Sequence, residues 1–179
     1  RPMDDIELVI LDEKNEILGM GEEGEICVSG ARVMREYLKQ EQATHEAVHD
    51  GFLHTGDVGY LDEDRYLFIT GRKKDLIIRG GENISSGEIE AVLEEHEAVE
   101  EAAVIGVPDV EWGEEVKAVV VLEPGHTVGA DDLRAYAKSR IASYKVPRYV
   151  AIVDELPRNA LGKILKTEIR KQHGGPDER

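Results

Sequence analysis

The sequence predicts an α+β fold: a small β-rich, barrel-like unit followed by a compact α/β unit with a three-stranded sheet flanked by helices. Two observations predict this division. Before Arg72, short apolar segments alternate with Gly- or Asp-rich turns, and none of them has the length of a long helix. After Arg72, segments with helical spacing alternate with β-prone segments. We expect the boundary at Gly71–Asp75, where two glycine-bearing segments meet a cluster of charges.

The first unit contains five short segments rich in β-branched, aromatic and other apolar residues, separated by turn-forming residues. The Asp50-Gly51 turn limits any helix near residues 42–49 to one or two turns. We expect strands over Ile6–Leu11, Glu25–Val28, Phe52–His54, Val58–Leu61 and Tyr66–Thr70.

The second unit alternates strands and helices. Ser85 and Glu88 form an S-x-x-E pattern typical of a capping box, and Ile89, Val92 and Leu93 follow at helical spacing. We therefore expect a helix that begins near Ser85. Further strands are expected over Leu76–Ile78, Glu101–Val107, Glu115–Leu122 and Tyr149–Val153, and further helices over Asp131–Tyr144 and Leu165–Lys171.

Composition excludes several classes of function. The chain has 179 residues and a net charge of −16, which argues against binding to nucleic acid or to anionic lipid. It has one cysteine, Cys27, so an internal disulfide is impossible and a reducing compartment is expected. No apolar run reaches the ~20 residues needed to cross a membrane, and no signal peptide is recognisable. These observations predict a cytoplasmic protein, and Arg1–Met3 suggests a cut from a longer polypeptide.

Three short motifs match functional patterns without the context that those patterns require. His45–His49 has the HExxH form of zinc proteases, but the Asp50-Gly51 turn leaves too short a helix for two ligands. Gly19–Gly24 has the GxGxxG form, but a strand follows it rather than a helix. Gly162-Lys163 lacks the other residues of a phosphate-binding P-loop. We therefore expect no metal site and no dinucleotide site here.

Four further segments occur in a fixed order, and each alone is ordinary turn chemistry. Together they resemble the adenylate-forming superfamily of acyl-CoA synthetases, peptide-synthetase adenylation domains and beetle luciferases. The resemblance covers the chain from about Ile6 to Lys171. The segments are HTGD at His54–Asp57, GRKKD at Gly71–Asp75, GGENI at Gly80–Ile84 continuing into GEIE at Gly87–Glu90, and PRNALGK at Pro157–Lys163.

The resemblance implies a two-step ligase in which a carboxylate attacks the α-phosphate of ATP and a thiol then displaces AMP. It implies that Asp57 and Arg72 contact the ribose of the nucleotide. An ionised carboxylate has enough lone pairs to accept hydrogen bonds from both ribose hydroxyls. Lys163 matches the lysine required for adenylation, where a cation offsets the repulsion between two approaching anions. Lys74 matches the hinge about which the carboxy-terminal domain moves.

The same resemblance places Gly80 and Gly81 along the tunnel for the pantetheine arm of coenzyme A. It places Trp112, Tyr144 and Arg148 at positions that contact coenzyme A in some members. A core tryptophan, a helix-end tyrosine and a surface arginine are equally good interpretations of these three residues.

The resemblance also implies the domain organisation and the ligands. Residues 1–72 are expected to end a large amino-terminal domain, 73–172 to form a mobile carboxy-terminal domain and 173–179 to be a disordered tail. The implied ligands are ATP, Mg²⁺, coenzyme A and a carboxylic acid, with ATP and Mg²⁺ bound largely by the missing amino-terminal domain. The fragment alone is expected to be inactive.

The sequence departs from the family pattern in two places. Glu36 stands where glycine is usual, and Gln40–Thr44 lacks the usual proline. Three functions stay open: a synthetase for a fatty or other acyl-CoA, an adenylation domain that loads a carrier protein, and a non-catalytic acidic module for protein contacts. The GRKKD and GGEN segments resemble the CoA ligases more closely.

Overall fold

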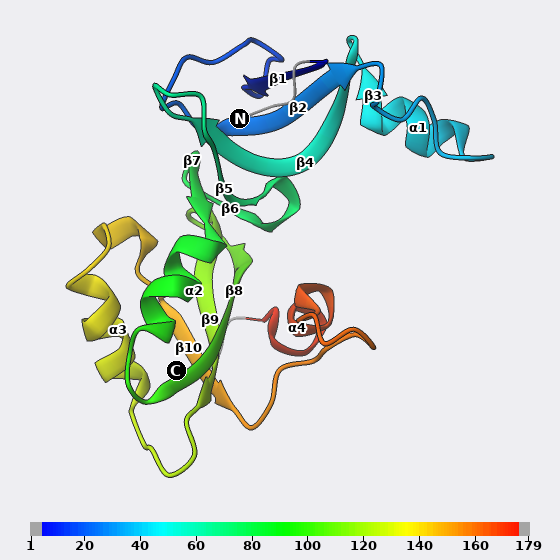
Figure 1. Ribbon diagram of the computed structural model, residues 1–179. Helices are drawn as coiled ribbons and strands as arrows, with labels where there is room; N and C mark the ends of the chain where they lie inside the picture. Colours follow the sequence, from blue (N-terminus) through cyan, green and yellow to red (C-terminus); the bar gives the residue numbers. More distant parts are fainter. Residues whose placement is uncertain (1–4, 176–179) are drawn as a thin grey trace. The chain divides into compact units, whose positions relative to one another are not determined.

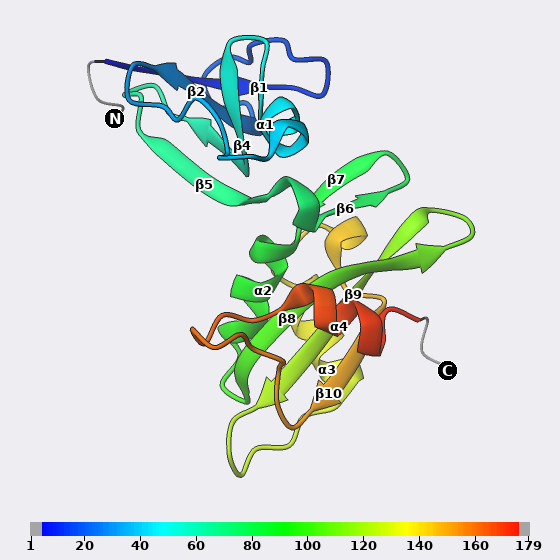
Figure 2. The same ribbon diagram turned by 90° about the vertical axis from the view of Figure 1, so that its right-hand side faces the viewer.

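We describe the fold from a computed structural model of the chain, in which residues 5–175 are described. The chain divides into two compact units between Lys74 and Asp75, inside the expected boundary segment. Each unit is described by itself, and both are labelled in Figures 1 and 2. The assignment of these units to larger domains stays a prediction.

The first unit is an antiparallel sheet of five strands. β1 pairs with β2, β2 pairs with β4, and both β3 and β5 pair with β4, so the sheet is open. The expected barrel-like unit is thus a curved, incomplete barrel, and Figure 1 shows the long bend of β4. The elements are β1 (Ile6–Leu11), β2 (Gly24–Gly30), α1 (Glu41–Ala47), β3 (Val48–His49), β4 (Phe52–Leu61) and β5 (Leu67–Arg72).

One long strand replaces two that we expected. The HTGD segment does not interrupt β4, because Gly56 takes a positive φ of 72° while the strand continues on both sides of it. The neighbouring β2 shifts register between Glu25 and Cys27, which compensates for the irregularity. A bulge within β4 therefore presents the HTGD side chains, and we call this bulged part of the strand, His54–Asp57, the HTGD loop.

The second unit has five strands among the described residues, so the expected three-stranded sheet is wrong. β8, β9 and β10 form the expected part, and β10 runs parallel to β9. The additional part is a hairpin of β6 and β7, which meets β9 through Arg79 and Gly113. The elements are β6 (Leu76–Arg79), β7 (Glu82–Ser85), α2 (Ser86–Glu94), β8 (Val99–Asp109), β9 (Gly113–Leu122), α3 (Ala130–Lys138), β10 (Tyr149–Val153) and α4 (Lys166–His173).

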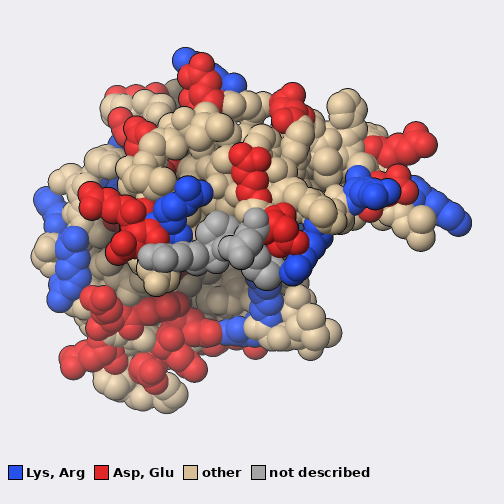
Figure 3. Space-filling model, turned by 45° about the horizontal axis from the view of Figure 1, so that its top comes forward, with Lys and Arg blue, Asp and Glu red and all other residues tan. Residues whose placement is uncertain are grey.

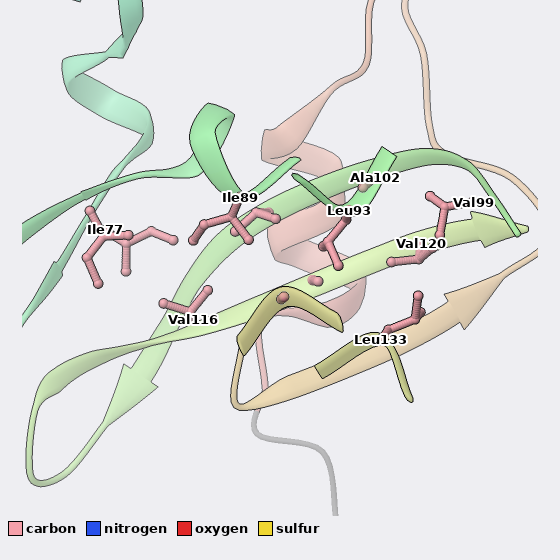
Figure 4. Packing of buried hydrophobic residues seen from close by; sticks show 12 residues of the cluster. Ile77, Ile89, Leu93, Val99, Ala102, Val116, Val120 and Leu133 are labelled. Atoms are coloured by element: carbon pink, nitrogen blue, oxygen red, sulfur yellow. The ribbon is translucent and has the colours of Figure 1, made fainter. Parts of the chain in front are cut away.

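Helices cover both faces of this sheet. α2 and α3 lie on one face and α4 lies on the other (Figure 1). Alternate residues of β9 face each layer: Val120 packs with Leu93 of α2 and Leu133 of α3 (Figure 4), whereas Val119 packs with Ile169 of α4. Both faces are buried, which explains why β8 and β9 read as continuous apolar runs rather than alternating ones.

Two helix boundaries differ from expectation. α3 ends at Lys138 rather than Tyr144, because the Ser139 hydroxyl donates to the Tyr136 carbonyl at 2.8 Å and competes with the next helical turn. Residues Ser143–Lys145 form a separate 3₁₀ turn, η2. α4 includes His173, the first residue of the expected tail, because the fully buried Ile169 fixes this helix to the sheet. The rest of the expected tail, beyond residue 175, lies outside the described residues.

The surface carries many charges of both signs. On the face drawn in Figure 3, groups of acidic side chains lie with basic side chains between them. Among residues 5–175, no helix combines the length and the apolar composition that crossing a membrane requires.

Candidate functional site

In the first unit, Asp57 and Arg72 lie opposite each other on β4 and β5. The Arg72 Nε donates to Asp57 Oδ1 at 2.8 Å, and the two side chains are 46% and 30% exposed. An ion pair this exposed contributes at most about 1 kcal/mol to folding. The pair is thus available to a ligand at little cost to the fold.

The loop before Asp57 is fixed by its own side chains. The Thr55 hydroxyl donates to the Ile26 carbonyl at 2.7 Å and accepts the Asp57 backbone N–H at 3.1 Å. A cavity of about 360 Å³ lies beside this loop. Its lining residues are Thr55, Gly56, Arg72, Lys73 and Lys74.

A buried carboxylate, Glu25, lies behind the same loop. It accepts from the Lys73 ammonium at 2.8 Å and from the Gly56 backbone N–H at 3.2 Å, and it pairs with His54 Nδ1 at 3.1 Å. Burial raises the pKa of this carboxyl, but the hydrogen bonds from Lys73 and His54 outweigh burial, so its pKa lies below the usual value. Glu25 is therefore ionised at neutral pH.

Glu25, Cys27 and His54 are the one group within residues 5–175 whose ligand atoms could jointly reach a metal ion, with all three atoms within 4.8 Å of one another. The Lys73 ammonium already neutralises Glu25, and the Cys27 thiol strongly resists ionisation. We therefore assign no metal to this group. The HExxH histidines do not share a helix either, since α1 ends at Ala47 and His49 lies in β3, stacked on His54.

Burial, together with the negative charge of Glu25, raises the pKa of the Cys27 thiol to about 12. The thiolate is the reactive form, and Cys27 is 0% exposed. We predict that iodoacetamide alkylates Cys27 at least ~100-fold more slowly in the folded chain than in urea. Intact-protein mass spectrometry over time measures both rates, and comparable rates would contradict the burial of this thiol.

In the second unit, Lys163 lies on an exposed loop that Asn159 organises. The Asn159 Oδ1 accepts the backbone N–H groups of Leu161 and Lys163, both at 2.9 Å, and Gly162 turns the chain at a φ of 82°. Arg158 donates to the Gly162 carbonyl at 2.7 Å and pairs with Glu101 of β8. Among residues 5–175, no hydrogen bond or ion pair holds the Lys163 ammonium. The loop is fixed and its cation remains available.

Gly80 and Gly81 form the tight turn between β6 and β7. Their φ angles are 60° and 90°, which favour glycine at both positions of a two-residue hairpin. The Gly80 N–H donates to the Trp112 carbonyl at 2.8 Å, and a Cβ on residue 80 would lie 2.7 Å from Trp112 Cε3. The Arg79 guanidinium stacks over the indole at 4.7 Å. The absence of a Cβ at Gly80 thus allows the Trp112 ring to pack against the backbone of the turn.

Arg148 joins this group through a buried carboxylate. Glu115, which is 2% exposed, pairs with Arg79 and with Arg148 Nη1, the latter at 3.3 Å. Asp109 lies 3.6 Å from the same Nη1, and backbone N–H groups of Trp112 and Glu111 lower the pKa of its carboxyl. The structure therefore brings Gly80, Trp112 and Arg148 together.

Tyr144 stands apart from this group. It lies in η2 rather than at the end of a helix, and its ring contacts Lys145 at 5.8 Å. Within residues 5–175, no hydrogen bond or ring contact joins it to Trp112 or Arg148. Lys74, the expected hinge, lies in the 3₁₀ turn Lys73–Asp75 at the point where the two units divide.

Sequence reasoning missed the two buried carboxylates, Glu25 and Glu115. Each lies near the start of a strand, directly before an apolar residue, and their partners come from segments far away in the sequence. The only signal was an acidic residue in a β-prone run, which predicts exposure more often than burial. Cross-strand pairing, which is not readable from one sequence, decides their roles.

The comparison with family models finds one match. Residues 88–163 match the AMP-binding enzyme C-terminal domain. The match includes the Lys163 loop and ends before α4.

Similar proteins extend the match to most of the chain. A feruloyl-CoA synthase of an Amycolatopsis species is 49% identical over 154 residues, covering 86% of this chain and 31% of that protein. The fatty acid–[acyl-carrier-protein] ligase ScoC of Streptomyces coeruleorubidus is 43% identical over 170 residues, covering 95% of this chain and 33% of that protein. The chain thus spans about a third of the length of the curated relatives it matches.

A solved structure agrees. The o-succinylbenzoate CoA synthetase MenE of Bacillus subtilis, in complex with the acyl-adenylate intermediate OSB-AMP, superimposes with a TM-score of 0.87 and 40% identity. The match covers 98% of this chain and 36% of that protein.

Proposed function

Because residues 88–163 of this chain match the AMP-binding enzyme C-terminal domain and the chain resembles a carboxy-terminal portion of adenylate-forming ligases, we propose that its protein is an ATP-dependent acyl-CoA synthetase. The protein joins a carboxylic acid to AMP with release of pyrophosphate. The thiol of coenzyme A then attacks the acyl carbon, and AMP leaves. The single observation that best supports this proposal is the Asp57–Arg72 pair beside its cavity.

In the first step, Asp57 accepts hydrogen bonds from the ribose hydroxyls, and Arg72 holds that carboxylate in place and contacts the ribose. Their mutual contact at 2.8 Å fixes the acceptor before the nucleotide binds, which lowers the entropic cost of binding. Residues outside this chain are proposed to bind the triphosphate, Mg²⁺ and the acid.

Lys163 is the proposed catalytic residue of adenylation. Its ammonium lies between the incoming carboxylate and the α-phosphate and offsets their repulsion as charge shifts toward pyrophosphate. Asn159 and Arg158 hold the backbone of the loop, so the lysine side chain alone has to adjust.

In the second step, the proposed path of the pantetheine arm runs past Gly80 and Gly81, with Trp112, Tyr144 and Arg148 as further contacts to coenzyme A. The space beside Gly81 is open, since a Cβ built on this residue would meet no atom within 4 Å. Arg148 is half exposed and suits the phosphates of coenzyme A. Tyr144 lies outside the Trp112 group, in η2.

Lys74 is the proposed hinge between the two steps. The division of the chain after this residue supports a change of backbone angle there. A domain that turns about Lys74 would withdraw Lys163 once acyl-AMP has formed and would bring the Gly80–Gly81 turn to the acyl carbon.

We further propose a fatty acid as the carboxylic acid. The name of ScoC supports this choice, whereas the other two relatives are named for ferulic acid and o-succinylbenzoate. ScoC is also named for a carrier-protein acceptor, so an adenylation domain that loads a carrier protein is the second candidate function.

The test is mass-spectrometric detection of acyl-CoA from the full-length protein with ATP, Mg²⁺, coenzyme A and a mixture of acids. The mixture should contain fatty, hydroxycinnamic and succinylbenzoic acids. A fatty acyl-CoA product is the expected result. Acyl-AMP without acyl-CoA would favour a carrier protein as acceptor, and no adenylate at all would favour a non-catalytic module.

A further inference from the structure

Three segments of the first unit converge on one carboxylate. Glu25 lies in β2, Gly56 lies in the loop of β4, and Lys73 directly follows β5. The carboxylate Oε1 accepts from Gly56, and Oε2 accepts from Lys73 and pairs with His54. Two of these contacts lie next to a proposed ribose residue, since Gly56 precedes Asp57 and Lys73 follows Arg72.

The local strand pairing places the Glu25 side chain beside the HTGD loop. The register of β2 against β4 shifts between Glu25 and Cys27, and at this shift the Glu25 carboxylate accepts the Gly56 backbone N–H of the HTGD loop. The side chain is 8% exposed. Removing an ionised carboxylate from water is costly, so a buried Glu without partners would not persist there. Its three contacts replace the lost hydration.

The contacts of Glu25 with Gly56 and with Lys73 have different effects on Asp57 and on Arg72. The Gly56 N–H lies in a loop where φ is 72°, and a hydrogen bond to a charged acceptor holds that unusual backbone. The Lys73 side chain is 56% exposed, and its stem reaches inward to Glu25. One carboxylate therefore fixes the loop that carries Asp57 and the strand end that carries Arg72.

We propose that Glu25 is a positioning residue for ribose recognition, which sets the spacing of Asp57 and Arg72 by holding Gly56 and Lys73. The proposal rests on the proposed function of this pair. Glu25 does not contact the nucleotide; it acts through the backbone on either side of it. Its loss changes how well the ribose hydroxyls are recognised more than how fast the reaction proceeds.

The experiment compares ATP with 2′,3′-dideoxy-ATP in the adenylation reaction of the full-length protein. Hydrogen bonds to a charged acceptor give the wild type a preference for ATP in kcat/KM of roughly tenfold or more. Glu25→Gln keeps the shape but removes the charge. We expect it to reduce this preference by at least about threefold, with the KM for the acid unchanged. General loss of stability would lower both rates together and leave their ratio unchanged.

A second variant, Lys73→Met, tests the same interaction in case Glu25→Gln does not fold. Lys73→Met removes the contact on the β5 side from a residue that is not part of the core, and it should also reduce the preference. Adding it to Glu25→Gln should change little, because both act through one interaction. Glu7→Gln, an exposed glutamate of β1 that bonds Ser29, is the matched control and should keep the wild-type preference.

The outcomes separate this inference from the proposed function. A wild-type protein that forms no adenylate overturns the proposed function, and the positioning role falls with it. A wild-type preference for ATP that is unchanged in both Glu25→Gln and Lys73→Met overturns the positioning role alone. If Glu25→Gln does not fold, the ratio measured for Lys73→Met decides.

Discussion

Replacing Lys163 by alanine should lower the adenylation rate of the full-length protein about 100- to 1,000-fold, which is the usual effect of removing one group that stabilises transition-state charge. The ammonium has no partner among residues 5–175, so its removal breaks no contact of the folded loop. Asn159 still holds the backbone through two hydrogen bonds. The loss should therefore be chemical rather than structural, and pyrophosphate release measures it.

The thiol-transfer step provides the internal control. Supplied acyl-AMP should be converted to acyl-CoA at the wild-type rate, because the proposed role of Lys163 is confined to the first step. Lys171→Ala, which removes an exposed lysine of α4 paired with Glu168, should leave both steps unchanged. Equal losses in both steps, or an unchanged adenylation rate, would mean that Lys163 does not have the proposed role.

The second large effect concerns stability. Leu93→Ala should lower the free energy of unfolding of the second unit by about 3 kcal/mol. Leu93 is fully buried between α2 and the sheet, near Ile89 and Val120 (Figure 4), so truncation removes apolar contacts and leaves a cavity. Urea denaturation of the chain, followed by far-UV circular dichroism, measures the change.

Leu161→Ala is the matched control for this prediction. Leu161 is 93% exposed on the Lys163 loop, and the same truncation there should change the free energy by no more than about 0.5 kcal/mol. Similar costs at the two leucines would contradict the packing of the second unit.

Most strands could be predicted, because their signals are local. The β-prone runs at Ile6–Leu11 and Glu115–Leu122 each became a strand with nearly the expected bounds. β7 was missed, although the Gly80-Gly81 pair is a strong hairpin signal. Its residues, Glu82–Ser85, are mostly polar, and only pairing with β6 makes them a strand.

The site was readable only in part, for a related reason. Asp57, Arg72 and Lys163 stand in motifs whose order along the chain carries the resemblance. Glu25 and Glu115 stand in no motif, and their importance comes from partners that folding brings to them. The sequence therefore revealed the residues expected to contact the ligands. It did not reveal the buried carboxylates that hold the segments carrying such residues.

The position of Trp112 makes the proposed coenzyme-A path of this protein accessible to fluorescence spectroscopy. It is the only tryptophan in the chain, and its ring lies against Gly80 and beneath Arg79. Selectively excited fluorescence of this chain therefore reports on one place, the turn between β6 and β7. A cofactor arm passing that turn, or a shift of the guanidinium, would alter the emission without any label.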